Sequence, residues 1–321
     1  MRFATREEHD SYVTDWVSDA GGLWAITCYF NPMRFRRRIL NYRLFRERLK
    51  VPLVAIELAY GPEFELGEGD AEILVQLRGG RDVLWQKERL LNLAMRSLPS
   101  TCSKVAWIDC DVVFEADTWS ERTSALLDGF ALVQPFSHLH QMPRDWEPGH
   151  ARPPRTGLLH SVPFLIASGM PVATCLGTTQ SQLSPGHVWA ARRELLDAHH
   201  LYDACIIGGG DIAIARAAYR CFEFAIRRQH LNENHYLAWA RPFCDEVCGK
   251  VAHLEGDLFH LWHGESEHRR YLERNEGLGR FRFDPSADIA LDQNQAWRWN
   301  SDKREMHDYV RDYFASRRED G

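Results

Sequence analysis

The stretch KVAWIDCD, residues 104–111, places a short apolar segment directly before two carboxylates. An apolar run of this length is typical of a buried strand. In an extended backbone, residues i and i+2 point to the same side, so Asp109 and Asp111 face one spot just past the strand. Such a pair suits a hard divalent cation that carries phosphate oxygens. A D-x-D triplet occurs by chance about once in a chain of this length, so its position after a strand gives it weight.

Other apolar runs on both sides of this stretch predict further strands. They cover residues 23–29, 51–58, 72–77 and 130–135, with helical patterns at 34–50 and 83–98 between them. Near-continuous apolar strands that alternate with helices predict an α/β fold with a mostly parallel sheet covered on both faces. Ligands of such sheets bind at the carboxyl ends of the strands. Tyr29, Asn31, Glu57 and Asp109 all fall at such ends.

The composition excludes several classes of protein. The chain has 321 residues, and 39 basic against 45 acidic side chains give a net charge of −6. With 45% hydrophobic and 26% charged residues, it is neither a disordered chain, nor a collagen-like repeat, nor a strongly basic nucleic-acid binder. No run of about 18 apolar residues predicts a membrane span. The polar N-terminus lacks the centre of a secretory signal, and cysteines in apolar runs suit a reducing compartment, so we expect a cytoplasmic protein.

The charge is uneven along the chain. Residues 34–50 carry eight basic residues and one Glu, a local charge of +7, which leaves −13 for the remainder. Apolar residues recur at helical spacing here and predict an amphipathic helix, with Asn31 as its N-cap and Pro32 in its first turn. The basic face is either simply solvated or turned toward an anion. The apolar positions are Phe35, Ile39, Tyr42, Phe45 and Leu49.

Three further motifs carry side chains suited to chemistry. In HLWH, residues 260–263, a helical turn would let His260 and His263 share one metal, or the two histidines are incidental. In IGGGD, Asp211 opens a helix, either as its N-cap or as a carboxylate base. In WQKERLLN, residues 85–92, Lys87 and Arg89 are either solvated or reach a diphosphate. Asp82 is the expected cap of that helix.

A zinc site is a competing metal hypothesis. Cys244 and Cys248 could join His253 and His260, since thiolates and imidazoles are zinc ligands. The spacing between these residues is not a common one for such sites.

Taken in order, these motifs resemble the GT-A nucleotide-sugar glycosyltransferases, and in particular the inverting β-1,4-galactosyltransferase family and its bacterial relatives. WQKERLLN is similar to that family's aromatic-x-Arg-x-Lys-Leu-Leu-Asn helix, and WIDCD is similar to its D-V-D strand end. GHVWAARRELL resembles its Gly-Val strand entering a helix. IIGGGD stands where the family has Trp-Gly-Gly-Glu-Asp-Asp, and HLWH resembles its Met-x-x-His metal pair. The likeness covers roughly residues 23–264, with the middle loop unmatched.

The resemblance implies a role for each site residue. Asp111, His260 and His263 would bind a divalent metal, manganese before magnesium. Asp109 would contact the ribose or donor sugar, and Lys87 the nucleotide or its diphosphate. Tyr29, Asn31 and Arg34 would frame the uridine pocket, with Glu57 at the next strand end. Asp211 would be the general base. The implied donor is a nucleoside-diphosphate sugar, with UDP expected as the nucleotide.

Two departures concern the acceptor. The family's acidic cluster is reduced to Asp211, which could bind the acceptor instead of taking its proton. Ile206 or Ile207 stands where the family has its acceptor-site Trp, so the usual amino sugar is not the expected acceptor. A glycan or a small molecule is expected ahead of a nucleic acid or a protein.

The resemblance also divides the chain. We expect an N-terminal extension over 1–22, a GT-A domain over 23–265 with an acceptor loop at 143–186, and a helical tail over 266–321. The Arg-rich stretch after residue 268 would close over the diphosphate or form a solvated helix. The alternative functions are a nucleotidyltransferase, which would need a Gly-rich basic loop where CYFNPMRF stands, and a non-catalytic carbohydrate- or nucleic-acid-binding protein.

Overall fold

The computed structural model describes residues 22–146, 158–177, 182–271 and 273–321. At its centre lies a seven-stranded sheet in the order β11-β6-β10-β4-β1-β2-β3. Its strands are β1 (Leu23–Phe30), β2 (Leu53–Ala59), β3 (Ile73–Arg78), β4 (Lys104–Ile108), β6 (Leu132–Gln134), β10 (Val188–Arg192) and β11 (Val251–His253). The predicted strand KVAWI is β4, residue for residue, and the other four predicted strands are present with ends that differ by one or two residues.

The sheet is parallel except for β10, which confirms the predicted α/β fold with a mostly parallel sheet. β10 runs antiparallel to both of its neighbours, β4 and β6. It enters at the carboxyl edge of the sheet, where the backbone N–H of Asp109 donates to the carbonyl of His187 at 2.7 Å. The residue just before β10 therefore lies beside the end of β4, at the edge where ligands of such folds bind.

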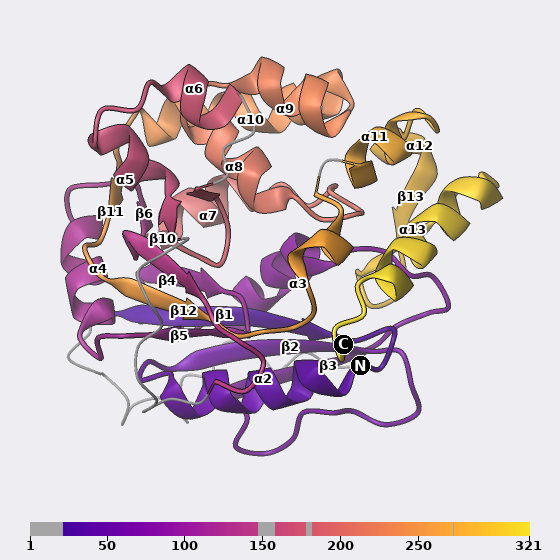
Figure 1. Cartoon of the computed structure of the whole chain (residues 1–321), viewed down its shortest axis with the longest axis horizontal. Coiled ribbons are helices and arrows are strands. Elements are labelled where there is room, and N and C mark those ends of the chain that lie inside the picture. Colours follow the sequence, from indigo (N-terminus) through magenta and orange to yellow (C-terminus); the bar gives the residue numbers. More distant parts are fainter. Residues whose placement is uncertain (1–21, 147–157, 178–181, 272) are drawn as a thin grey trace.

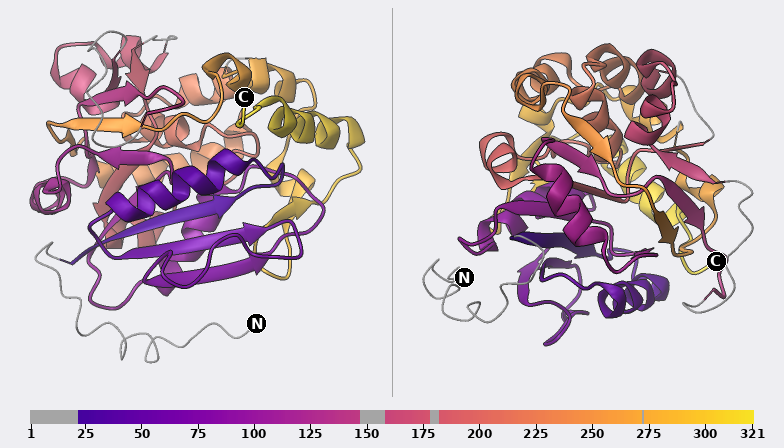
Figure 2. Two further views of the ribbon diagram at one scale, coloured as in Figure 1. Left: turned by 60° about the horizontal axis from the view of Figure 1, so that its bottom comes forward. Right: turned by 90° about the vertical axis from the view of Figure 1, so that its left-hand side faces the viewer.

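Helices cover both faces of the sheet (Figures 1 and 2). One apolar core joins the sheet to α2 (Arg36–Arg48) and α4 (Trp119–Leu127). The other joins it to α3 (Lys87–Ala94), α7 (Arg193–His199), α8 (Gly210–Ala218) and α10 (Glu233–Val247). The side chains of β1 alternate between the two cores: Ile26 packs on the α3 side and Ala25 on the α2 side.

A second sheet lies against the carboxyl edge of the first. Its order is β5-β12-β7-β8-β9, with β5 (Val112–Phe114), β12 (Asp257–His260), β7 (His138–Gln141), β8 (Leu159–Ser161) and β9 (Leu183–Ser184). β5 starts directly after Asp111 and β12 ends at His260, and the two strands pair antiparallel with His260 opposite Val112. This pairing brings the carboxylate and the imidazole together. The helical turn predicted for His260 and His263 is wrong, because His260 ends β12 and residues 261–263 are not helical.

The expected acceptor loop over 143–186 contains regular structure in its described part. Besides β8 and β9, it holds α5 (Val162–Ala167) and α6 (Val172–Gly177). Residues 147–157 and 178–181 of this loop lie outside the described residues, as does nearly all of the expected N-terminal extension, residues 1–21.

The predicted N-cap of the basic helix is wrong. α2 begins at Arg36, with Phe35 in the cap position and no cap from its side chain. The Asn31 side chain instead accepts a hydrogen bond from the backbone N–H of Phe35 at 2.9 Å and donates to the Phe35 carbonyl. Asn31 therefore closes a turn before the helix, and Pro32 lies in that turn. The predicted apolar face is correct, because Tyr42 and Phe45 are buried.

The predicted cap of the next helix is also wrong. α3 begins at Lys87 and continues into a 3-10 turn, η1 (Met95–Ser97). Asp82 lies outside it and accepts a hydrogen bond from the backbone N–H of Trp299 at 3.0 Å. The apolar residues of the 83–98 pattern, Leu84, Leu91, Met95 and Leu98, are all buried.

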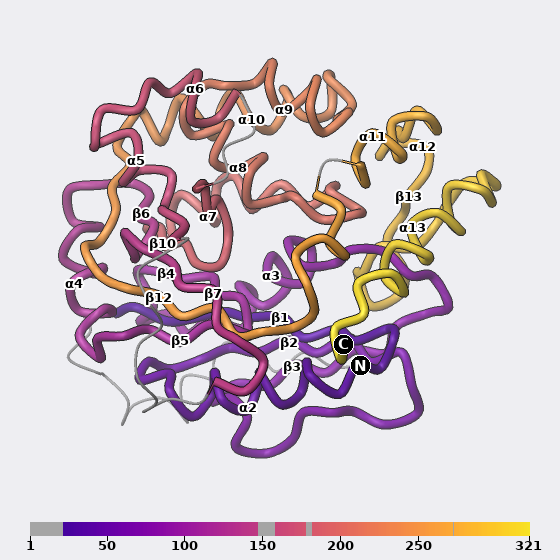
Figure 3. The backbone as a smooth tube through the Cα atoms, in the orientation of Figure 1, coloured from indigo at the N-terminus to yellow at the C-terminus, as the bar shows by residue number. Residues whose placement is uncertain are grey.

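The C-terminal tail is helical in parts, as predicted, and it also contains a hairpin. Its elements are η2 (Ser266–Arg269), α11 (Glu273–Gly279), α12 (Pro285–Asp288), β13 (Ile289–Leu291), β14 (Trp297–Trp299) and α13 (Arg304–Ser316). After α13 the chain returns to the start of α2 (Figure 3).

Among the described residues, no helix combines the length and the apolar character needed to cross a membrane. The remaining helix, α9 (Phe222–Gln229), packs between α8 and α11.

Asn92 should be needed for stability, because it joins α3 to the segment before α8. Its side chain donates to the Leu201 carbonyl at 2.9 Å and accepts from the Leu201 N–H at 2.8 Å, both in a buried setting. Asn92→Ala leaves these groups without partners and should lower the free energy of unfolding by about 2–4 kcal/mol. Urea denaturation measures the loss. The exposed Asn300→Ala is the control and should change stability by less than about 0.5 kcal/mol; equal effects would refute the assigned role.

Candidate active site

A buried lysine joins two carboxylates at the carboxyl edge of the main sheet. Lys87 Nζ lies 2.6 Å from Asp109 Oδ1 and 2.7 Å from Asp211 Oδ2. Lys87 comes from the start of α3, Asp109 from the end of β4 and Asp211 from the first turn of α8. Burial alone would lower the pKa of Lys87, but the two carboxylates hold that pKa well above its usual value. The lysine is therefore a fixed positive charge that sets the positions of both acids.

The two acids respond differently to this lysine. Burial would raise the pKa of Asp109, but Lys87 outweighs it and the pKa is lowered. For Asp211, burial prevails over Lys87 and the pKa is raised. The group whose pKa is higher is the better proton acceptor.

The three glycines before Asp211, residues 208–210, explain how its carboxylate comes to bond Lys87. Gly209, at φ +93°, takes the cap position of α8, a backbone conformation that favours glycine. Asp211 is therefore not the N-cap, and its carboxylate bonds Lys87 instead. A Cβ on Gly210 would overlap the carboxylate of Glu88, so this glycine allows α8 and α3 to approach closely.

Asp111 lies beside two histidines, His187 and His260. Ligand atoms from these three residues lie within 4.8 Å of one another, and they are the one such group of three among the residues that the structure describes. His260 Nδ1 lies 2.7 Å from Gln141 Oε1, which can only accept. Nδ1 therefore carries the proton, and Nε2 carries a lone pair that lies 3.0 Å from His263 Nε2 and 3.8 Å from Asp111 Oδ1.

The donor set fits a divalent metal. Asp111 Oδ1 and His187 Nδ1 are buried and have no hydrogen-bond partner. Burial lowers the pKa of His187 to about 4 and that of His260 well below its usual value, so both imidazoles are neutral and able to ligate. Burial and Asp109 raise the pKa of Asp111 to about 6. Two imidazoles with one carboxylate suit a transition-metal ion better than magnesium.

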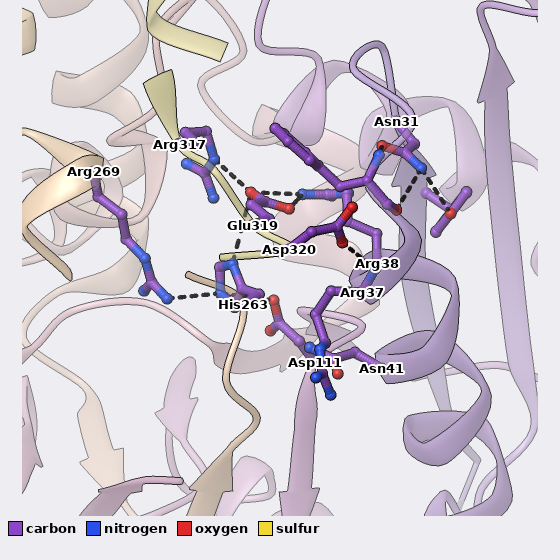
Figure 4. A network of polar contacts seen from close by, with 12 residues as sticks. Asn31, Arg37, Arg38, Asn41, Asp111, His263, Arg269, Arg317, Glu319 and Asp320 are labelled. Carbon is purple, nitrogen blue, oxygen red and sulfur yellow. Dashed lines mark hydrogen bonds and ion pairs between the residues drawn. The ribbon is translucent and has the colours of Figure 1, made fainter. Parts of the chain in front are cut away.

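His263, the third predicted ligand, lies next to this group (Figure 4). Its Nε2 is 3.0 Å from His260 Nε2 and 3.2 Å from Asp111 Oδ2. Arg269 donates to the same Nε2 at 3.0 Å, so the lone pair that could bind a metal is occupied by a guanidinium. Burial and Arg269 lower the pKa of His263 to about 3.

The residues predicted for the uridine pocket line one cavity of about 210 Å³ beside the ends of β1 and β2. Tyr29, Asn31 and Arg34 form one side of it. Tyr29 and Asn31 both donate to the carboxylate of Glu65, a residue that the sequence did not single out. A nucleotide base of ordinary size would have to compete with or join these bonds.

Glu57 lines the same cavity but has a structural role there. Its carboxylate is buried and accepts from the backbone N–H groups of Glu65 and Leu66, at 2.6 and 3.2 Å. It also accepts from Gln76 at 3.0 Å. Glu57 therefore fixes the loop that carries Glu65 and has little capacity left for a ligand.

The competing zinc hypothesis finds no support in the described residues. Cys244 is buried within α10 and Cys248 is exposed just past its end, and the clustered ligand group described above contains neither.

A larger cavity, of about 500 Å³, surrounds Lys104 and Arg192. These residues begin β4 and end β10, so the cavity lies at the opposite edge of the sheet from the site.

Besides Glu65, sequence reasoning missed His187 and Glu319. His187 directly precedes an apolar strand and has a φ of +76°; a strand that enters the sheet from the functional edge would have drawn attention to it. Glu319 lies in the tail, 1% exposed. Burial would raise its pKa, but Arg317 and Arg38 hold that pKa well below its usual value. No local pattern in the sequence marks it.

No family model and no curated protein match this sequence. Solved structures similar to the chain include residues 1–349 of S. aureus TarS in complex with UDP-GlcNAc, at 11% identity and a TM-score of 0.35, with 60% of this chain and 51% of that chain covered. This chain thus spans about half the length of that structure. The catalytic domain of Drosophila β1,4-galactosyltransferase 7, in complex with xylobiose, is 10% identical over 90% of this chain and 98% of its own, with a TM-score of 0.36.

A third similar structure is the 4-diphosphocytidyl-2C-methyl-D-erythritol synthase of Anaerococcus prevotii, at 10% identity and a TM-score of 0.34, with 74% and 88% of the two chains covered. The similar structures are therefore GT-A glycosyltransferases and related nucleotidyltransferases, at low identity. Overlaps this loose assign no activity to this chain, which has to be inferred from its own residues.

Glu88 should make stability depend on pH. Burial raises its pKa from 4.5 to about 8, so the folded chain holds a proton there that the unfolded chain releases at lower pH. The free energy of unfolding of the wild type should then fall as pH rises from about 5 to 8. Glu88→Gln, which mimics the protonated acid, should lack this fall.

Urea denaturation at several pH values measures the difference between the two proteins. Glu88→Gln should gain on the wild type by about 1 kcal/mol for each pH unit between 5 and 8. Glu305→Gln, an exposed residue of α13, is the control for loss of charge. A difference that does not change with pH would contradict the raised pKa of Glu88.

Proposed function

We propose that this chain is a metal-dependent glycosyltransferase that moves a sugar from a nucleoside-diphosphate sugar, with UDP as the expected nucleotide, to an acceptor hydroxyl. The observation that carries the proposal is the convergence of three parts at one edge of the sheet. A candidate metal group, a lysine held between two acids and a cavity of about 210 Å³ all lie there. Transfer from a sugar nucleotide needs a place for a diphosphate, a base and a nucleoside, and these parts match those needs.

The parts divide the substrate between them. Tyr29, Asn31 and Arg34 border the cavity and would contact the nucleoside. Asp111, His187 and His260 would hold the metal, with His263 beside them. The metal would supply positive charge to the diphosphate oxygens when bound. Asp109 follows β4, the neighbour of β1 and β10 in the sheet, and would contact the ribose or the donor sugar.

Lys87 and Asp211 supply the remaining chemistry. Lys87 adds a fixed positive charge close to the charge that develops on the departing diphosphate. Asp211 Oδ2 lies 2.7 Å from Lys87 Nζ, and its raised pKa suits the removal of a proton from an acceptor hydroxyl. Direct attack by that hydroxyl on the anomeric carbon gives inversion of configuration.

A nucleotidyltransferase is less compatible with these residues. Such an enzyme would be expected to wrap the phosphates in a Gly-rich basic loop after the first strand. Here the segment after β1 is the turn that Asn31 closes before α2, and no glycine occurs in residues 23–50.

The proposed activity is tested by the release of nucleoside diphosphate from a panel of sugar nucleotides, with and without Mn²⁺. We expect release from at least one UDP-sugar that depends on the metal and is increased by an acceptor. A panel without turnover, together with no metal-dependent nucleotide binding, would refute the proposal.

Two substitutions separate the roles of the acids. Asp111→Asn should abolish metal-dependent donor binding, because it removes a charged ligand. Asp211→Asn should leave donor binding intact and lower transfer by about 10²–10⁴-fold, the usual contribution of a general base. Asp117→Asn, at an exposed position after β5, is the matched control. Normal donor affinity in Asp111→Asn would remove the ligand assignment, and retained transfer in Asp211→Asn would remove the base.

A further inference from the structure

The chain that follows α13 passes His263 and reaches α2 (Figure 4). We call residues 317–320 the C-terminal strap. Its backbone packs closely on the loop after His263, because a Cβ on Gly264 would lie 2.8 Å from the Arg317 carbonyl and 2.9 Å from the Arg318 carbonyl. Gly264 also has a φ of +87°. This glycine therefore allows the strap to lie directly against the segment that follows His263.

Two arginines hold Glu319 in the strap. Arg317 Nε donates to Glu319 Oε1 at 2.5 Å, and Arg38 of α2 donates to Oε2 at 3.0 Å. The side chain of Glu319 is 1% exposed, so this carboxylate is fixed between charged partners and shielded from water. A charge placed this deeply needs such partners to remain ionised.

Glu319 faces the outer nitrogen of His263. His263 Nδ1 is buried, makes no hydrogen bond and lies 3.6 Å from Glu319 Oε1. Nε2 of the same ring accepts from Arg269 and so carries a lone pair, which places the proton on Nδ1. A carboxylate facing the N–H of an imidazole fixes its tautomer and orientation and increases its basicity at the other nitrogen.

Asp320 fastens the other side of the strap. Its carboxylate accepts from the backbone N–H groups of Arg36 and Arg37, at 3.1 and 2.7 Å, and so caps α2 from the far end of the sequence. Arg144 donates to the Asp320 carbonyl at 2.7 Å. The strap is thus held at both ends, with Glu319 in the middle.

We propose that Glu319 is a positioning residue that orients His263 as a further ligand of the metal. The inference rests on the proposed function for the presence of a metal at Asp111, His187 and His260. It goes beyond that function in assigning the strap a role. Glu319 holds the His263 ring with Nε2 beside Asp111 and His260, where a metal would compete with Arg269 for its lone pair.

The test measures Mn²⁺ binding by calorimetry, with the full chain and no nucleotide. Glu319→Gln should weaken Mn²⁺ affinity by about 10–100-fold, the usual effect of losing an outer partner of a ligating histidine. Glu319→Asp should recover part of the loss, because it restores the charge. Asp245→Asn, which breaks the exposed pair with Arg220, is the control and should bind like the wild type. Thermal unfolding of each variant checks that it is folded.

A double-mutant cycle separates positioning from general damage. If Glu319 acts through His263, then His263→Ala and the double variant His263→Ala/Glu319→Gln should bind Mn²⁺ with the same affinity. Additive losses, or unchanged affinity in folded Glu319→Gln, would overturn the proposal. A wild type that binds no Mn²⁺ would overturn it together with the metal dependence of the proposed function. A wild type that binds Mn²⁺ and obeys the cycle, yet transfers no sugar, would support the strap and refute the transferase.

Discussion

The candidate site depends on one buried charge, that of Lys87. Its Nζ lies within 2.7 Å of carboxylates from two separate elements, β4 and α8, and it belongs to a third, α3. Removing one partner from a buried ion pair costs about 3–5 kcal/mol, because the remaining charge is left uncompensated. None of the three groups can therefore move far without the others. The lysine keeps the end of β4 and the glycine loop in register, and this register also determines where Asp111 stands.

Around this charge, the antiparallel entry of β10 decides which side chains can act together. In a purely parallel sheet, every strand would contribute its last residues to the functional edge. β10 instead contributes the residue before its start, His187, and the second sheet contributes His260 from the end of β12. One imidazole, that of His187, therefore precedes the first residue of β10, and the other, that of His260, belongs to the last residue of β12. A candidate metal group of mixed donors thus lies beside Lys87, and none of its three residues, Asp111, His187 and His260, belongs to a helix.

The sequence predicts the parts of this arrangement that depend on local patterns. The apolar run of β4 and the two acids after it are visible by inspection, and so are Lys87 within a helical pattern and Asp211 after three glycines. The structure brings all of these together. What could not be predicted depends on partners far along the chain. Asn is a residue type that commonly caps helices, and Asn31 lies just before α2. The carboxylate that caps α2 is nevertheless that of Asp320, 284 residues from Arg36. Glu57 lies at a strand end, where ligand-binding residues are expected, but its carboxylate oxygens accept hydrogen bonds from the backbone N–H groups of Glu65 and Leu66.

The long return of the chain has a consequence for folding during synthesis. Glu319 and Asp320 contact Arg38, Arg36 and Arg37, so these contacts close loops of more than 280 residues. A ribosome delivers the chain from its N-terminus at about 5–20 residues per second, and the main sheet is complete once β11 has emerged. At that point α2 and His263 still lack their partners Glu319 and Asp320, which are synthesised last of these segments. A nascent chain halted before residue 317 would lack the partners of α2 and His263, so arrest at that point should separate the folding of the main sheet from the completion of the candidate site.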